Sequence, residues 1–416
     1  MTRPSLSDRA LRTGKRVWRS IAPGSLRRLA GPGVALMAER RVRAALVESE
    51  RPLQPGPLIV SGLIAETKGV SEAARLTIAG LRHAGFSPIA HDLRPLLTAG
   101  PGARGALPAD RPGGVWIAHV NAPEAVHALA YLDPNEWRGR YRIGYWAYEL
   151  PRVPASWIRA SQAFHELWVP SRFVAEALKS SGVTRPVRVM PHAVSAAWPA
   201  IQGVRSAFAP ADSFVVLAMG DLRSSAWRKN LLGAIEIYKR AFPAQGQSHL
   251  VLKLQSEEAH PRFREAAVAL AAGRTDISFL TDSLSSEDMR RLIASCDVVL
   301  SPHRSEGYGL ALAEAFLAGV PALATGWSGN VDFMGSLSEL LIDHTMIPVR
   351  DPAGVYRASA QLWAEPDLDD GARKLKALHA DPVRRAELAR LGMEVVRSQM
   401  ASWSHESLAD VARLIA

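Results

Sequence analysis

Short apolar runs alternate with stretches of helical spacing along most of the 416-residue chain. In the first half, apolar runs bounded by turn residues predict buried strands. These runs are residues 57–62, 115–120, 141–148, 166–170 and 187–190. The spacing of residues 70–84 and 173–180 predicts helices between them. Such alternation indicates a parallel sheet covered by helices.

The pattern lapses into Ala, Pro, Gly and Ser at residues 195–212 and then begins again. The second series of predicted strands is residues 214–219, 250–254, 277–280, 298–300 and 321–324. The predicted helices of this series are residues 230–242, 286–295 and 310–318. From about residue 351 the pattern is largely helical. The predicted fold class is α/β, with two Rossmann-like doubly wound parallel-sheet domains facing across a cleft.

The pattern divides the chain into four parts, two of which are domains, and a length of 416 residues exceeds what one hydrophobic core usually organises. The four parts are a basic N-terminal extension at residues 1–52, an N-terminal domain at 53–197, a C-terminal domain at 198–390 and a helical segment at 391–416. We expect the last segment to pack across both domains. Ligands of open parallel sheets bind beyond the carboxyl ends of the strands, so we expect the site between the domains.

Charge is concentrated at the N-terminus. The chain carries a net charge of +10, and residues 1–51 hold twelve Lys or Arg against four Asp or Glu. A basic arm on a nearly neutral body favours contact with an anionic membrane surface over nucleic-acid binding, and a solvated leader is the alternative. The segment lacks the apolar core of a secretory signal, and no apolar run is long enough to span a membrane. We expect a cytoplasmic protein with peripheral contact to the inner face of the cytoplasmic membrane.

A single cysteine, Cys296, precedes the apolar residues 298–300. One cysteine excludes an intramolecular disulfide and a cysteine-based metal cluster. We expect a buried structural thiol.

The strongest chemical signal is the segment 305–315, which follows a predicted strand and opens a predicted helix. If Gly307 and Gly309 form the turn, the helix begins near Leu310, and its free backbone N–H groups can hold a diphosphate. Glycine allows the close approach that this requires. The alternative is an exposed helix start.

Two glutamates of this segment stand eight positions apart, Glu306 before the helix and Glu314 just over one turn inside it. They can therefore reach different parts of one extended ligand. Carboxylates bind sugar hydroxyls through charge-assisted hydrogen bonds. We assign Glu306 to the transferred sugar and Glu314 to a ribose, against the alternative that both merely favour the positive end of a helix.

A second signal is the loop at residues 220–230, which contains Arg228 and Lys229. Two cations at this position stabilise the negative charge that gathers on a leaving diphosphate. They act more strongly in the transition state than in the ground state and replace the need for a metal. A solvated basic helix start is the alternative.

Taken together, these segments resemble glycosyltransferase family 4, of the GT-B fold class, over roughly residues 57–410. In the second half the spaced glutamates, the basic pair and the glycine loop at residues 325–330 match the family pattern. In the first half the likeness is looser and rests on residues 69–75, 145–149 and 191–194.

The resemblance implies a retaining, metal-independent hexosyltransferase. The acceptor hydroxyl would attack the face from which the diphosphate leaves, and a phosphate oxygen would take the proton. His119 is similar to a family histidine that faces the donor sugar, and a purely structural histidine is the alternative. The expected catalytic residues are His119, Arg228, Lys229 and Glu306. The expected donor-binding residues are Gly69, Gly220, Asp221, Ser224, Gly307, Tyr308, Gly309, Leu310, Glu314, Ser328, Gly329 and Asn330.

The same resemblance implies the substrates. The donor would be a GDP- or UDP-sugar, bound as a co-substrate by the C-terminal domain, with no metal and no cofactor. The acceptor would be a glycan or polyprenyl-linked saccharide in bacterial surface polysaccharide biosynthesis, bound by the N-terminal domain. The sequence departs from the family at one point, because Asp221 follows Gly220 where the family often has arginine. Either Arg223 or Arg228 compensates.

Three other classes of protein are alternatives to this interpretation. A metal-dependent transferase would need an Asp-x-Asp motif, and the segment 367–369 is explained better as acids at a helix start. A dehydrogenase would need three spaced glycines, which the segment 307–309 does not supply. The non-enzymatic alternative is a catalytically inactive scaffold that binds a nucleotide-sugar for glycan assembly.

Overall fold

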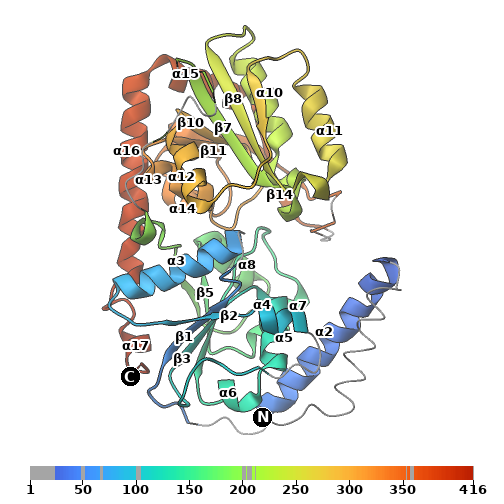
Figure 1. Cartoon of the computed structure of the whole chain (residues 1–416), viewed down its shortest axis with the longest axis vertical. Helices are drawn as coiled ribbons and strands as arrows, with labels where there is room; N and C mark the ends of the chain where they lie inside the picture. The colour runs from blue at the N-terminus through green and yellow to red at the C-terminus, as the bar shows by residue number, and fades with distance from the viewer. Residues whose placement is uncertain are drawn as a thin grey trace.

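The structure is a computed structural model of the chain. It describes residues 24–47, 52–65, 69–99, 105–198, 203, 209–210, 212–352, 354–356 and 360–415. Within these residues, each half of the chain forms a six-stranded parallel sheet covered by helices, and the two halves are stacked along the long axis of the molecule (Figure 1). The α/β fold class predicted from the sequence is confirmed.

The first sheet has the strand order β2-β1-β3-β4-β5-β6. Its strands are β1 (Leu58–Gly62), β2 (Ile89–Asp92), β3 (Val115–His119), β4 (Tyr141–Tyr145), β5 (Glu166–Val169) and β6 (Val187–Val189). Its helices are α2 (Gly24–Val47), α3 (Gly69–His83), α4 (Arg94–Ala99), α5 (Ala122–Tyr131), α6 (Pro134–Trp137), α7 (Ala155–Ser161) and α8 (Arg172–Ser180), followed by the 3-10 turn η1 (Val194–Ala197). The inner strands β1, β3 and β5 are buried throughout, as parallel strands covered on both faces must be.

The second sheet has the strand order β12-β11-β10-β7-β8-β9. Its strands are β7 (Phe214–Asp221), β8 (Ser248–Gln255), β9 (Ile277–Leu280), β10 (Val298–Ser301), β11 (Ala322–Thr325) and β12 (Leu341–Ile342). Its helices are α9 (Ala226–Lys229), α10 (Leu231–Ala241), α11 (Pro261–Leu270), α12 (Ser286–Ala294), α13 (Leu310–Leu317), α14 (Val331–Met334), α15 (Leu368–Ala380) and α16 (Pro382–Ser398). The short 3-10 turns here are η3 (Leu222–Ser224), η4 (Glu257–Ala259) and η5 (Ser338–Leu340).

Beyond residue 351 the described chain is largely helical, as expected, with one strand besides. This strand, β14 (Leu362–Pro366), pairs antiparallel with β13 (His344–Pro348). Strand β14 buries Trp363 and donates a backbone hydrogen bond from Ala364 to the carbonyl oxygen of Arg304. These partners are distant in sequence, so helical periodicity could not reveal the strand. The acids at 367–369 do begin a helix, because the Asp367 side chain accepts from the backbone N–H groups of Asp369 and Asp370 at the start of α15.

The C-terminal segment crosses from the second half to the first (Figure 1). Helix α16 packs so tightly on α13 that a Cβ added to Gly392 would lie 2.1 Å from the Phe316 ring. It continues into the 3-10 turn η6 (Gln399–Trp403) and α17 (Ala409–Ala412). Trp403 is fully buried, donates from Nε1 to the carbonyl oxygen of Pro191 at 2.7 Å and packs edge-on against Trp168. The end of the chain therefore belongs to the core of the first half.

Replacing Trp403 with Ala is expected to lower the free energy of unfolding by about 3–5 kcal/mol, because it opens a cavity in the first-half core and orphans the Pro191 carbonyl oxygen. Urea denaturation measures the change. The matched control is Val383→Ala on the exposed face of α16, where the side chain is 79% exposed and a change within about 0.5 kcal/mol is expected. Equal losses in the two variants would contradict the docking role of Trp403.

The basic N-terminal extension is partly described. Residues 24–47 form α2, which lies against α5 and buries Ala38, Val42 and Ala45. Glu39 of this helix pairs with Arg159 at 2.9 Å. Residues 1–23 and 48–51, which hold most of the basic positions assigned to membrane contact, lie outside the described residues.

Two further expectations concern membrane spans and the single cysteine. Among the described residues, no helix is both long and apolar enough to span a membrane. Cys296 is buried, as expected, and its Sγ donates to the carbonyl oxygen of Leu292 at 3.1 Å.

Candidate active site

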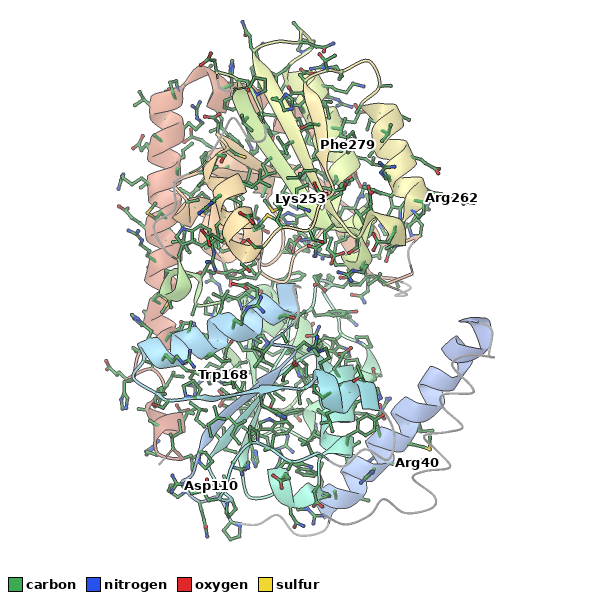
Figure 2. The ribbon with its side chains drawn as sticks, viewed as in Figure 1. Arg40, Asp110, Trp168, Lys253, Arg262 and Phe279 are labelled. Atoms are coloured by element: carbon green, nitrogen blue, oxygen red, sulfur yellow. The ribbon has the colours of Figure 1, made fainter. Side chains whose placement is uncertain are left out.

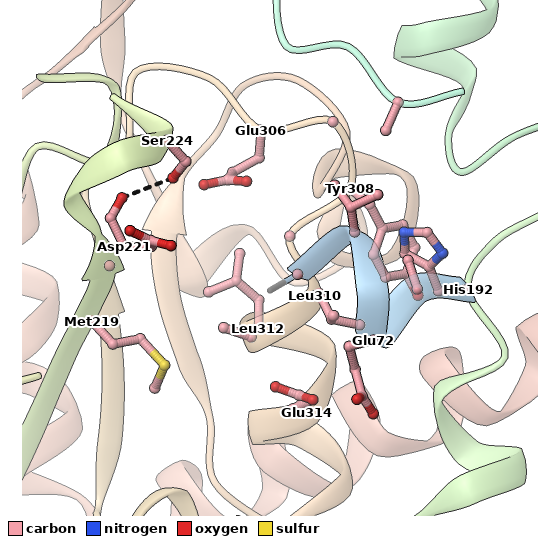
Figure 3. Close-up of a pocket in the computed structure, with 18 of the residues that line it drawn as sticks. Glu72, His192, Met219, Asp221, Ser224, Glu306, Tyr308, Leu310, Leu312 and Glu314 are labelled. Atoms are coloured by element: carbon pink, nitrogen blue, oxygen red, sulfur yellow. Dashed lines mark hydrogen bonds between the residues drawn. The ribbon is translucent and has the colours of Figure 1, made fainter. Parts of the chain in front are cut away.

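A cavity of about 630 Å³ is lined by residues from both halves of the chain. Strands β1, β3 and β4 point their carboxyl ends toward it from one side, and β7, β8 and β10 from the other. All of the site residues predicted from the sequence line this cavity except Ser328, Gly329 and Asn330. Figure 3 shows Glu306, Glu314, Tyr308, Leu310, Asp221 and Ser224 around it.

Glu306 lies between two cations. Its Oε1 accepts from Lys229 Nζ at 2.6 Å and lies 3.0 Å from an Arg228 nitrogen. Arg228 is 3% exposed and also donates to the carbonyl oxygens of Ser305 and Ser224. Burial by itself raises the pKa of the Glu306 carboxyl, but the adjacent Arg228 and Lys229 reverse this effect, so its pKa lies well below the ordinary value. The cluster is thus a fixed array of charges.

The loop after β7 places these cations through two residues with positive φ. Ser225 (φ 72°) accepts from the Arg228 N–H, and Asn230 (φ 52°) ends α9 and caps α10 by accepting from Gly233. Asparagine tolerates this left-handed conformation better than most residues and is a good helix cap. The one-turn helix α9 is confined between the two bends, which orients Arg228 and Lys229 toward Glu306.

The two arginines that could compensate for Asp221 lie in different environments. Arg223 pairs with Asp221 itself at 3.0 Å, and both line the cavity. Arg228 is the arginine that contacts Glu306. Gly220 precedes this pair at the end of β7, and Ser224 donates from its hydroxyl to the carbonyl oxygen of Asp221 at 2.9 Å (Figure 3).

Helix α13 begins where the glycine pattern predicts. Gly309 has φ 95° and is the residue before Leu310, the first residue of the helix. Gly307, Gly309 and Leu310 all line the cavity, so the amino end of α13 borders it. Tyr308 also lines the cavity, but its hydroxyl donates to Gln399 of η6 at 2.6 Å.

Glu314 faces the cavity one helical turn further on, near Glu72 of α3 (Figure 3). Burial raises the pKa of the Glu314 carboxyl to about 8, the Glu72 charge adds to this effect, and Arg290 opposes it. Arg290 of α12 lies 3.6 Å from Glu72 and joins the two halves across the cleft. Sequence reasoning assigned no role to Glu72 or Arg290.

His119 ends β3 and forms the opposite wall. It is 3% exposed, and neither ring nitrogen has a hydrogen-bond partner within the described residues. Its ring stacks on Tyr145 with centroids 4.1 Å apart. Burial, with a smaller contribution from His192, lowers the pKa of His119 to about 3, so the ring is neutral and can donate and accept one hydrogen bond each. Gly69, at the start of α3, lines the same side of the cavity.

Glu149 is a third residue to which sequence reasoning assigned no role. It lines the cavity with one carboxylate oxygen 4.0 Å from Arg228. The other oxygen accepts from the Tyr356 hydroxyl at 2.8 Å. Residue 149 ends one of the first-half segments that resemble the family, and its acidic side chain was the available signal.

Ser328, Gly329 and Asn330 do not line the cavity, and their hydrogen bonds support the loop that carries Glu306. Ser328 accepts from the Glu306 N–H at 2.8 Å, and Gly329 donates to the Glu306 carbonyl oxygen at 2.9 Å. Asn330 is fully buried and donates to the carbonyl oxygen of Thr325. Their hydrogen bonds face the protein, and they hold the Glu306 loop in place.

Replacing Gly329 with Ala is expected to displace this loop, since the added Cβ would lie 2.2 Å from the Gly307 carbonyl oxygen. A shift of about 1 Å at reacting groups costs on the order of 10²-fold in rate, so we expect a loss of that size in kcat. The matched control is Gly326→Ala in the same loop, whose Cβ would meet its nearest atom at 3.3 Å. Comparable rates in the two variants would contradict the supporting role of Gly329.

Comparison with solved structures gives the fold class. The chain is similar to sucrose-phosphate synthase from Thermosynechococcus elongatus, at 14% identity and a TM-score of 0.57, over 86% of this chain and 98% of that one. It is also similar to an E. coli trehalose-6-phosphate protein bound with UDP-2-fluoro glucose, at 12% identity and a TM-score of 0.56, over 86% and 100%. The match to S. aureus TarM, in complex with fondaparinux, α-GlcNAc-glycerol and UDP, has 13% identity and a TM-score of 0.48, and covers 72% of this chain and 54% of that one.

The fold is therefore GT-B, as the sequence resemblance implies. Residues 171–408 match the family described as "Family 4 Glycosyltransferase in conflict systems". Because this match covers more than half of the chain, the protein belongs to the family 4 glycosyltransferases. A comparison with curated protein sequences found no match.

Proposed function

We propose that the protein is a retaining, metal-independent glycosyltransferase that moves a hexose from a GDP- or UDP-sugar. The observation that carries this proposal is the Glu306–Arg228–Lys229 cluster, which lies beside the amino end of α13 in a cavity bordered by both halves. A helix amino end and two cations together suit a diphosphate.

The cations act on the leaving group. When the bond between the sugar and the diphosphate breaks, the departing phosphate oxygen gains negative charge. Arg228 and Lys229 are already positioned by Glu306 and by backbone carbonyl oxygens, so they stabilise this charge without reorganisation. Because the charge grows along the reaction, the stabilisation is larger in the transition state than with bound donor.

Sugar recognition falls to Glu306 and His119 in this proposal. Glu306 is charged and accepts hydrogen bonds from sugar hydroxyls, and the neutral His119 ring both donates and accepts. Glu314 binds the ribose. The acceptor hydroxyl forms the new bond on the face that the diphosphate leaves, and its proton passes to a phosphate oxygen. Family membership supports this retaining course.

The structural neighbours support a nucleotide-sugar donor. The E. coli protein of the same fold is bound with UDP-2-fluoro glucose. The alignment covers 100% of the E. coli protein and 98% of the sucrose-phosphate synthase, so both halves of each protein have counterparts here.

The proposal is tested with nucleoside diphosphates and nucleotide-sugars in a thermal-shift screen, because a ligand of the folded state raises the melting temperature. The ligand that binds is then offered with saccharide acceptors in excess chelator, and NMR reads the anomeric configuration of the product. Transfer with retention supports the proposal. An inverted product or a requirement for added metal contradicts it, and tight binding without turnover supports the inactive scaffold.

The acceptor class is the second part of the proposal, a glycan or polyprenyl-linked saccharide of bacterial surface polysaccharide assembly. Its support is the net +8 charge of residues 1–51, which would hold the protein near anionic lipid. Sedimentation with anionic liposomes tests this, and the full chain is expected to pellet more than a chain without residues 1–23, which keeps α2 in place. Equal pelleting would count against the membrane contact.

A further inference from the structure

A buried lysine interrupts the apolar strand β8. This strand pairs with β7 on one side and β9 on the other, and residues 250–254 are all buried. Parallel strands covered on both faces are normally continuous apolar runs, yet Lys253 stands here with 2% of its surface exposed. Figure 2 places it at the end of the second sheet that faces the first half. A buried charge opposes folding, and such departures from local rules mark functional positions.

The ammonium group of Lys253 has hydrogen-bonding capacity to spare. It carries three N–H donors, and the bond it makes within the described residues is to the carbonyl oxygen of Leu254 at 3.2 Å. Burial lowers the pKa of Lys253, and the carboxylates of Asp282 and Asp221 act in the opposite direction. The side chain lines the cavity of the active site. A donor is therefore available to a ligand at this point.

Lys253 lies away from the phosphate end of the cavity. Glu306 follows β10, Lys229 follows β7, and Lys253 lies in β8, which is the next strand in that order. Neighbouring strands are about 4.8 Å apart, so β8 is roughly 10 Å from β10. A nucleoside diphosphate with its phosphates at Lys229 can extend its base in this direction.

The cavity wall near β8 is suited to a flat ring. Met219 of β7 is the register partner of Lys253, and Leu284, in the loop before α12, and Met289 of α12 line the same cavity. Methionine side chains adapt their shape to aromatic surfaces, and ligand pockets typically combine apolar walls with a few polar groups that fix orientation.

We propose that Lys253 selects a nucleobase that presents carbonyl oxygens, as uracil and guanine do, in the part of the cavity lined by Met219, Leu284 and Met289. This rests on the proposed function, in which the donor is a nucleotide-sugar. An ammonium group can only donate, so at this ring position it favours a base with an acceptor over a base with a donor. Guanine offers O6 and uracil O4, whereas adenine has an amino group at the corresponding ring position.

Isothermal titration calorimetry of the full chain with UDP, GDP, ADP and inorganic pyrophosphate tests the proposal. At least one of UDP and GDP is expected to bind about tenfold tighter than ADP, the size of one hydrogen bond to a charged group. In Lys253→Met this preference should fall by about tenfold, with pyrophosphate binding unchanged. The matched control is Lys239→Met, which removes a lysine that donates to the Leu270 carbonyl oxygen outside the cavity.

The outcomes separate the two proposals. An unchanged base preference in Lys253→Met overturns the role of Lys253 and leaves the transferase proposal intact. Binding of no nucleoside diphosphate by the unaltered chain overturns both. If Lys253→Met does not fold, the unaltered chain still tests the proposal. ADP binding as tight as that of both UDP and GDP overturns the role of Lys253.

Discussion

Replacing Lys229 with Met is expected to lower kcat by about 10²- to 10³-fold, the usual effect of removing one preorganised group that stabilises developing charge. The Lys229 ammonium lies 2.6 Å from Glu306, and its side chain is 22% exposed. In the proposed reaction its removal takes away a cation at the leaving diphosphate, while Arg228 still pairs with Glu306. The fold is therefore expected to survive.

Lys229 gives a cleaner test than Arg228, whose side chain is 3% exposed and donates to two backbone carbonyl oxygens. Removing Arg228 would also destabilise the loop. The matched control for Lys229 is Lys376→Met, at an exposed position of α15, which should retain full activity. Steady-state kinetics with the donor found in the thermal-shift screen measure both variants, and circular dichroism checks their fold. If the kcat of Lys229→Met lies within about threefold of that of the control, Lys229 has no catalytic role.

Glu314 is expected to make stability depend on pH. The pKa of its carboxyl is raised from the ordinary value of 4.5 to about 8 by burial first and by Glu72 second. Between these values the native state holds a proton that the unfolded chain has released. The free energy of unfolding therefore falls as the pH rises through this window, by at most about 1.4 kcal/mol per pH unit. The contribution is complete below about pH 4.5 and lost above about pH 8.

Urea denaturation at a series of pH values between 5 and 9 measures this effect. Glu314→Gln cannot lose the proton, so its curve should be flatter than that of the unaltered chain. Glu72→Gln removes the like charge, which lowers the pKa of Glu314 and ends the fall at a lower pH. The matched control is Glu265→Gln, at an exposed position of α11, which should follow the unaltered chain. Identical slopes for Glu314→Gln and the unaltered chain would contradict the raised pKa.

The sheets could be predicted from the sequence because strands covered on both faces are continuous apolar runs, as β1 and β3 are. Strand β2 was not predicted because it lies at the edge of the first sheet and is only half-buried. Strand β14 was not predicted because it pairs with β13 across a connection of more than ten residues. In both cases the position depends on contacts that local periodicity does not contain.

Site residues with a local sequence signal could likewise be predicted, and those defined by distant contacts could not. Glu306 and Lys229 could be predicted because each follows a strand, and the carboxyl ends of parallel strands meet at one edge of a sheet. Glu72 and Arg290 could not, because their contact depends on how α3 and α12 face each other across the cleft. Lys253 did carry a local signal, a lysine inside an apolar run, but its meaning required the cavity beside it.

Because the C-terminal segment crosses to the first half, the two halves cannot be separated by a single cut between them. Trp403, Leu408 and Val411 lie in the same hydrophobic cluster as Val60 and Ile117 of the first sheet. A fragment that stops near residue 197 would lack these side chains and expose that surface to water, where it would promote aggregation. Joining residues 399–415 to such a fragment through a flexible tether should restore a soluble, separately folding unit.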